Sequence, residues 1–346
     1  MTENKVEKPL FDIDPEWQAR RREEIIEPGL PIVDPHHHLW DRGSRYLIEE
    51  LLADINEGHR ILATVFVQCD SMYRAGGDPA LAPIGETEFV NGEAAKGASG
   101  VYGSVKVCAG IVSFVDFFRG AGVDRVLETH LARGGDRFKG VRYCSVWDAD
   151  QTIKSTPMDF PRAMLMDEKF RAGFARLQRY SMSFDAWLYH TQIPELADLA
   201  RTFPTTSIIL DHIGAPLAIG VYKDKRREVF ADWKKNLQKL AECDNVTVKL
   251  GGLGMHVFNF GFDHTAEPVS SETLAEAWRP YIETTIEIFG PKRCMFESNF
   301  PVDKRSCSYH VLWNAFKRVA SKYSADEKTD LFKDTAIRVY RLADAL

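Results

Sequence analysis

The sequence predicts one α/β domain, a (β/α)8 barrel, and three observations lead to that fold class. From residue 31 onward, apolar strand-like runs alternate with amphipathic helical segments, which is typical of βαβ units and a parallel sheet. There are eight such runs, the strand number of this barrel. Polar residues end nearly every run, whereas the alternative, an open doubly wound sheet, gathers its polar groups at one or two switch points.

The expected strands are short apolar runs bounded by polar residues. We expect them at 31–36, Ala63–Cys69, Val105–Val112, Phe138–Ser145, Met182–Leu188, Ser207–His212, Val246–Leu250 and Arg293–Asn299.

Helices are expected between the strands and after the last one. Two long connecting segments, 70–86 and 251–271, are predicted to form walls of a pocket. Residues 1–30 are charged, and we expect them to form an extension or short helix outside the barrel domain of residues 31–346. The amphipathic segments are Val115–Ala132, Asp167–Arg179, Gln192–Phe203, Arg226–Cys243, Glu272–Phe289, 308–322 and Ala325–Leu342.

The composition narrows the function class. The 346 residues are 45% hydrophobic and 27% charged, as in soluble globular proteins. A net charge of -6 argues against a general nucleic-acid surface, and no apolar run has the length of a membrane span or a signal peptide. Six cysteines without a CxxC pair favour a reducing, cytoplasmic compartment. The expected partner is therefore a small-molecule substrate, and a homo-oligomer is left open.

The stretch from Pro31 to Asp41 places three histidines at the end of the first strand. Side chains alternate along a strand, so His36 and His38 share one face and His37 lies on the other. Two imidazoles that converge at a strand end suit a divalent metal, or a water or substrate oxygen. The alternative is a polar loop with exposed histidines.

Polar residues at the other strand ends point to the same edge of the barrel. Active sites of (β/α)8 barrels lie at the carboxyl ends of the strands. Each of these residues alone could cap a helix, but so many together predict an active site. They are Gln68-Cys69-Asp70, Arg142, Tyr189-His190, Asp211-His212, Lys249 and Glu297-Ser298-Asn299.

Three motifs give the chain a family resemblance: the HxH of strand one, Asp211-His212-Ile213-Gly214 on strand six, and Ser-x-Phe-Pro on strand eight. With them the chain resembles the amidohydrolase-related TIM-barrel family from about residue 30 to its end. It looks most similar to the branch that contains 2-pyrone-4,6-dicarboxylate lactonase and sugar lactonases. The resemblance implies that His36, His38 and His212 face the site and that Arg142 anchors an anion.

Strand eight departs from that family's pattern. The family usually has Ser-Asp-Trp-Pro, with the Asp as general base or metal ligand, where this chain has Ser298-Asn299-Phe300-Pro301. An amide takes no proton from water and is a weak, neutral ligand for zinc. The usual base and one strong metal ligand are therefore missing.

Two carboxylates are candidates to replace that Asp. Glu297 shares the inward face with Asn299 and lies about 6–7 Å deeper in the barrel. Because a buried charge needs a partner, we expect Glu297 to pair with Lys249, and with His36 or His38. Asp303, in the loop after the strand, is the other candidate base.

The expected function is hydrolysis of a lactone or related carboxylic ester by activated water. The histidines at 36, 38 and 212 would stabilise the oxyanion, Glu297 or Asp303 would take the proton, and Asn299 would orient the water. The residues expected to bind the substrate are Arg142, Arg74 and Lys249 for a carboxylate, and Tyr73 and the loop 256–264, with His256, for an apolar body.

Two other functions stay open. A metal-dependent decarboxylase of an aromatic or unsaturated acid would hold zinc or manganese on His36 and His38. A barrel that has lost its base would bind a ligand without turnover. The sequence does not decide whether a divalent metal or no cofactor is used.

Overall fold

Eight parallel strands form one continuous sheet in the computed structural model, which describes residues 13–345. The strands follow one another around the sheet in chain order, so each βα unit lies beside the next. All eight predicted strands are confirmed, with ends shifted by a few residues. They are β1 (Pro31–His37), β4 (Arg60–Val67), β5 (Lys106–Ser113), β6 (Phe138–Cys144), β7 (Ser183–Trp187), β8 (Ile208–Leu210), β9 (Val246–Leu250) and β10 (Cys294–Phe296).

The first and last strands meet and close the sheet into a barrel. The His38 backbone N donates to the Phe300 carbonyl at 2.8 Å, and the Asn299 N donates to the His36 carbonyl at 2.9 Å. The predicted (β/α)8 fold is thereby confirmed. Closure also brings the histidines of strand one against the Glu297–Asn299 segment.

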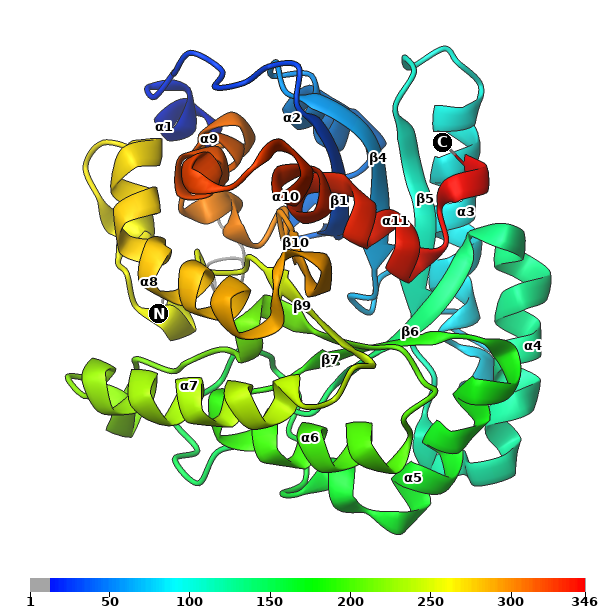
Figure 1. Cartoon of the computed structure of the whole chain (residues 1–346). Coiled ribbons are helices and arrows are strands. Elements are labelled where there is room, and N and C mark those ends of the chain that lie inside the picture. The colour runs from blue at the N-terminus through cyan, green and yellow to red at the C-terminus, as the bar shows by residue number, and fades with distance from the viewer. Residues whose placement is uncertain (1–12, 346) are drawn as a thin grey trace, which may run out of the picture.

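Helices surround the barrel in the order expected from the sequence (Figure 1). The helices α2 and α3 and the hairpin of β2 (Trp40–Arg42) and β3 (Ser44–Tyr46) were not predicted. The helices are α1 (Pro15–Ala19), α2 (Ile48–Ile55), α3 (Ile84–Ala98), α4 (Val123–Gly134), α5 (Glu168–Phe174), α6 (Ile193–Thr202), α7 (Arg226–Ala241), α8 (Ser271–Phe289), α9 (Tyr309–Val319), α10 (Ala325–Thr329) and α11 (Thr335–Tyr340).

Two predicted helices are interrupted. The segment predicted as one helix from residue 115 starts with the 3-10 segment Phe117–Gly122, which is kinked at Gly120 (φ 55°), and α4 begins after it at Val123. The segment predicted from residue 325 consists of α10, the π-helical turn Asp330–Asp334 and α11. These last helices, red in Figure 1, lie across one end of the barrel strands.

The described part of the N-terminal extension packs outside the barrel. The Gln18 side-chain amide donates to the Lys304 carbonyl, and Lys317 Nζ in α9 donates to the carbonyls of Ile26 at 2.7 Å and Glu27 at 2.9 Å. Residues 1–12 of the predicted extension and residue 346 lie outside the described residues.

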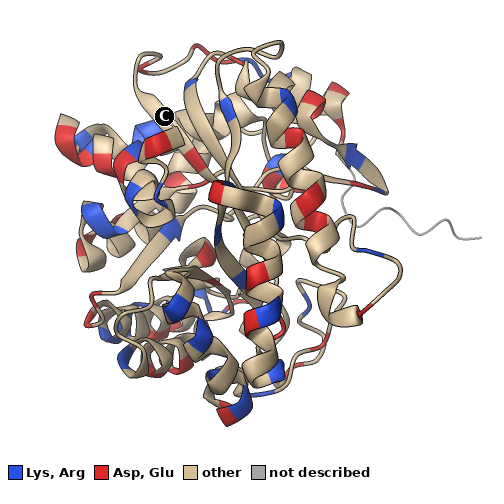
Figure 2. Ribbon diagram, turned by 90° about the vertical axis from the view of Figure 1, so that its right-hand side faces the viewer, with Lys and Arg blue, Asp and Glu red and all other residues tan. Residues whose placement is uncertain are grey.

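Acidic and basic residues are interspersed over the surrounding helices and loops (Figure 2). Between residues 13 and 345, no helix is both long and apolar enough to cross a membrane.

Candidate active site

The strand-one histidines adopt the predicted faces. His36 and His38 point into the barrel mouth with their Nε2 atoms 3.3 Å apart, and only 0% and 4% of their surfaces are exposed. His37 points outward, where its Nε2 lies 2.9 Å from Thr64 Oγ1. His38 Nδ1 lies 2.8 Å from the Val67 carbonyl, which can only accept, so the His38 proton sits on Nδ1 and its Nε2 keeps a lone pair.

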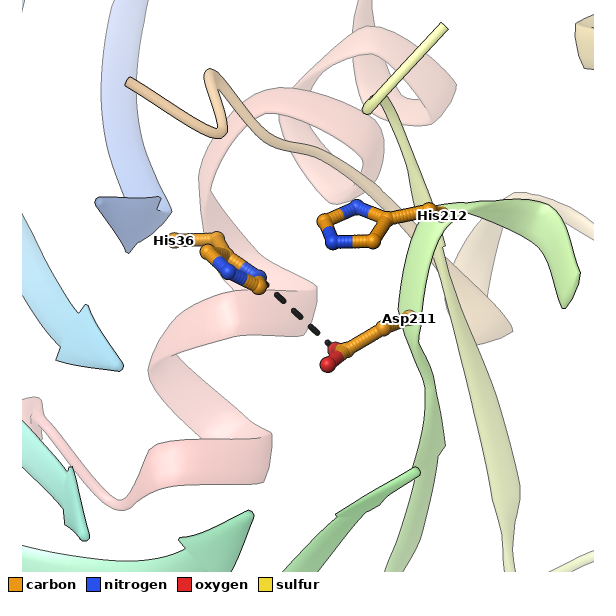
Figure 3. Close-up of side chains that lie close together, drawn as sticks. All are labelled: His36, Asp211 and His212. Atoms are coloured by element: carbon orange, nitrogen blue, oxygen red, sulfur yellow. Dashed lines mark ion pairs between the residues drawn. The ribbon is translucent and has the colours of Figure 1, made fainter. Parts of the chain in front are cut away.

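His212 is brought to the site by a tight turn after β8. His212 and Ile213 both have left-handed backbones, with φ of 53° and 52°, inside the 3-10 turn Asp211–Gly214. Such φ values are rare for β-branched and bulky residues and cluster at functional sites. The turn places the His212 ring 4.7 Å from the His36 ring, and Figure 3 shows His36, Asp211 and His212 directed toward one another.

Glu297 lies beneath these two histidines. Its Oε1 is 2.6 Å from His212 Nδ1 and 3.2 Å from the His212 backbone N, and its Oε2 is 2.8 Å from His36 Nδ1. The predicted pairing with His36 is confirmed. The predicted pairing with Lys249 is wrong, because among the described residues Lys249 forms its ion pairs with Asp185 and Asp211.

Lys249 is fully buried and contacts protein groups, so the prediction that it binds a substrate carboxylate is wrong. Its Nζ donates to Asp185 Oδ2 at 2.7 Å and to His36 Nδ1 at 3.1 Å, and lies 3.1 Å from Asp211 Oδ1. Burial lowers the Lys249 pKa, but the two Asp carboxylates outweigh it and raise the pKa above its usual value. The ammonium is therefore charged, and its position among Asp185, Asp211 and His36 is fully buried.

The two strand-one histidines facing the site are neutral near pH 7. Burial, and then the charge of Lys249, hold the pKa of His36 well below its usual value. Burial and the charge of Arg142 do the same for His38. Burial raises the pKa of Asp211, yet Lys249, His212 and Arg142 lower it further, so this carboxylate stays ionised.

Arg142 occupies the wall of the site as predicted. Its Nε lies 3.4 Å from Asp211 Oδ2 and its Nη1 donates to the Gln68 carbonyl at 3.2 Å, while Nη2 makes no hydrogen bond to the described residues. The guanidinium thus keeps donors for a substrate anion. Tyr73 lies beside Gln68, and burial together with the charges of Glu86 and Asp70 raises the pKa of Tyr73.

Arg74 does not join Arg142, so its predicted role is wrong. Its guanidinium forms a two-pronged pair with Glu88 in α3, at 3.1 and 2.6 Å, and Glu88 also binds Arg133 of α4. Arg74 is therefore held between outer helices of the barrel.

Asn299 and Asp303 form one unit. The Asn299 amide Nδ2 donates to Asp303 Oδ1 at 2.9 Å, and Asp303 Oδ2 accepts from the Gly254 backbone N at 2.9 Å. Burial raises the pKa of Asp303 to about 7. Since its NH2 group faces Asp303, Asn299 presents its oxygen to the opposite side.

The loop after β9 packs differently from the prediction. Phe260 contacts Tyr281 and Phe262 contacts Trp278, both in α8, so these rings fix the loop against that helix. His256 is exposed, and its ring lies against the backbone of Lys154 in the loop after β6. The loops after β6 and β9 therefore touch at this point.

Asp185 belongs to the catalytic centre but was not predicted from the sequence. A carboxylate inside the apolar run Ser183–Trp187 was the available signal, since an inward Asp there needs a charged partner. Asp211 was noted as a strand-end residue without a role, and the structure makes it the ion-pair partner of both Lys249 and Arg142.

This chain is a TIM-barrel protein with histidines from its first and sixth strands and a carboxylate from its eighth gathered at one centre. The family model described as amidohydrolase matches residues 33–342, so the chain belongs to the amidohydrolase family.

Two proteins of similar sequence and one of similar structure show which members of the family the chain resembles. The protein y4mH of Sinorhizobium fredii, described as uncharacterized, is 33% identical over 90% of this chain and 99% of its own length. An L-fucono-1,5-lactonase of Burkholderia multivorans is 28% identical over 53% of this chain and 59% of its own length. A crystal structure of an amidohydrolase from B. multivorans with bound zinc superposes with a TM-score of 0.68 at 25% identity, over 90% of this chain and 99% of that one.

The residues at the centre fit a divalent metal. His36 and His38 aim their Nε2 atoms at one point, and metal-bound imidazoles usually give their other N–H to a carbonyl or carboxylate. His38 already does so through Val67. A metal on His36 Nε2 requires the His36 proton to sit on Nδ1 in place of the hydrogen bond accepted from Lys249. Glu297 Oε2, which is buried without a hydrogen bond of good geometry, lies 2.8 Å from Nδ1 and would then be the acceptor. Asp211 is a weaker candidate ligand, because Lys249 and Arg142 already neutralise its charge.

Proposed function

We propose that this protein hydrolyses a lactone, or a related carboxylic ester, of a small carboxylate-bearing molecule. The observation that carries the proposal is the buried contact of 2.6 Å between Glu297 Oε1 and His212 Nδ1. With its proton held on Nδ1, His212 keeps a lone pair on Nε2, and an imidazole oriented in this way by a carboxylate acts as a general base. The similarity to an L-fucono-1,5-lactonase supports a cyclic ester as the substrate.

In this proposal the missing strand-eight Asp is replaced by a pair of residues. His212 Nε2 takes a proton from water, the hydroxide oxygen attacks the carbonyl carbon, and the imidazolium returns the proton to the alkoxide as the ring C–O bond breaks. Glu297 acts through His212 by stabilising the imidazolium, since both of its oxygens face ring nitrogens. Asp303 orients the Asn299 amide, whose oxygen accepts a hydrogen bond from the water.

The developing oxyanion lies near His36 and His38 in this proposal. A zinc or manganese ion held by their Nε2 atoms would supply Lewis acidity to the substrate carbonyl. The Arg142 Nη2 group holds the carboxylate of the substrate by a charge-assisted hydrogen bond. Tyr73 and Gln68 line the wall beside it.

A lactone panel tests the proposal. Purified protein is assayed with neutral and carboxylate-bearing lactones in a pH-stat, with metal analysis of the same preparation and with zinc or manganese added. We expect turnover of at least one lactone, and a loss of about 10²-fold or more in kcat for His212→Gln, the range given by removing a general base. His37→Gln is the matched control, because His37 is equally buried but faces away from the site.

Three results would contradict the proposal. Release of CO2 from an aromatic or unsaturated acid, without lactone opening, would favour the decarboxylase. Ligand-dependent stabilisation without turnover under every metal condition would favour a binding protein. Full activity in His212→Gln would show that the base lies elsewhere.

We further propose that the protein works in the cytoplasm. All six cysteines are free and buried, which agrees with a reducing compartment.

A further inference from the structure

A tyrosine from the C-terminal helix enters the barrel from the end opposite to the histidines. Tyr340 of α11 is fully buried in a cluster with β-strand residues that include Ala63, Val65 and Ala109. The small side chains of these strands leave room for a large ring. The helices α10 and α11, in red in Figure 1, lie across this end of the barrel.

The Tyr340 hydroxyl is joined to the catalytic centre by short polar contacts. It donates to Asp185 Oδ2 at 2.5 Å, and the same oxygen accepts from Lys249 Nζ at 2.7 Å. Lys249 then donates to His36 Nδ1 at 3.1 Å, and its Nζ lies 5.6 Å from the centre of the Tyr340 ring. A continuous line of contacts therefore runs from α11 to the strand-one histidines.

Asp185 depends on Tyr340 for its orientation. Its Oδ1 makes no hydrogen bond to the described residues, so the contacts that orient the carboxylate are both on Oδ2. Without the hydroxyl, Lys249 alone would hold that oxygen. The ammonium would then move toward Asp185, and its bond to His36 would lengthen.

We propose that Tyr340 and Asp185 are positioning residues for the catalytic centre: they hold the Lys249 ammonium where it orients the His36 ring. Neither residue touches the substrate. The effect on turnover rests on the proposed lactone hydrolysis, whereas the effect on His36 does not.

A spectrum of the histidine ring nitrogens tests the proposal without a substrate. The full-length protein is labelled with ¹⁵N-histidine, and His36 is assigned by its absence in His36→Gln. We expect Tyr340→Phe, which removes only the hydroxyl, to shift the His36 nitrogens beyond the linewidth. His37 and His130 are internal controls that should not move, because they bond Thr64 and Thr87 outside the barrel interior. Val339→Ala, which loosens the same helix without touching Asp185, should leave His36 unchanged.

Kinetics with a lactone from the panel provide the second readout. We expect Tyr340→Phe to lower kcat about tenfold with KM changed less than twofold, whereas Val339→Ala, which removes only packing of the same helix, should leave kcat unchanged. Unchanged His36 signals in Tyr340→Phe would overturn the proposal, whatever the substrate. If Tyr340→Phe does not fold, Asp185→Asn takes its place, and unshifted His36 signals there would overturn it equally. A His36 shift in a protein that opens no lactone would refute the proposed function alone.

Discussion

Replacing Glu297 by Gln separates catalysis from folding at this site. Glu297 contacts two imidazole nitrogens, His212 Nδ1 at 2.6 Å and His36 Nδ1 at 2.8 Å. The His212 contact is the one with hydrogen-bond geometry, and a hydrogen bond to a charged group contributes about 1.5–3 kcal/mol. At about 1.4 kcal/mol per factor of ten, we expect Glu297→Gln to lower kcat about 10- to 10²-fold.

Folding should survive this change because of the charge balance at the centre. Two cations, Lys249 and Arg142, face three buried carboxylates, Asp185, Asp211 and Glu297. Removing the Glu297 charge leaves two charges of each sign. We therefore expect the melting temperature of Glu297→Gln to stay close to that of the parent protein.

Initial rates in a pH-stat and thermal melting of the same samples check both expectations. Glu93→Gln is the matched control, since Glu93 is a mostly buried glutamate of α3 that binds Lys96 far from the histidines. A kcat within threefold of the parent value would refute the role of Glu297. A large loss of stability would refute the charge-balance reasoning.

Three further expectations follow from single residues. Lys249→Met leaves the carboxylates of the centre with one cation, so the free energy of unfolding measured in urea should fall by about 3–5 kcal/mol. A decrease below about 1 kcal/mol would show that the ion pairs of Lys249 do not stabilise the centre. Arg142→Met should raise KM about 10- to 100-fold for a carboxylate-bearing lactone, as expected for the loss of one charge-assisted hydrogen bond. The KM for a neutral lactone should hardly change. Equal increases for both lactones would show that Arg142 does not bind the carboxylate. Burial lowers the pKa of His130 from 6.5 to about 4. Between these pH values the unfolded chain binds more protons than the folded chain. The free energy of unfolding therefore rises with pH in this range, by up to about 3 kcal/mol. His130→Gln should flatten that rise in urea unfolding followed from pH 4 to 7, and an unchanged slope would show that His130 does not cause it.

The barrel could be predicted because its strands are short apolar runs that end in polar residues. This pattern can be recognised without tertiary information, as Val246–Leu250 with Lys249 near its end shows. The faces of His36 and His38 followed from strand alternation alone. The interruption of the predicted 325–342 helix could not be foreseen, because the π-helical turn Asp330–Asp334 contains no Pro or Gly to mark a break.

The ion pairs between site residues were harder to predict than the residues that form the site. Strand order makes β9 and β10 neighbours, so Lys249 and Glu297 were expected to pair. The register instead places Lys249 beside Met295, while Asp185 and Asp211 reach Lys249 from the other side. The role of Arg74 was also predicted wrongly because its partner was not foreseen. Glu88, which pairs with Arg74, lies on the helix α3, and that helix starts within the segment predicted to be a loop.

The contact between Tyr340 and Asp185 also bears on how the chain is made. The two residues are 155 positions apart in sequence, and Asp185, Lys249 and Glu297 all leave the ribosome before α11 does. Until α11 arrives, the barrel strands expose an open apolar end and a carboxylate that lacks one of its two donors. Nascent chains that stop short of α11 are therefore expected to remain aggregation-prone and to engage chaperones, although all eight strands are already present.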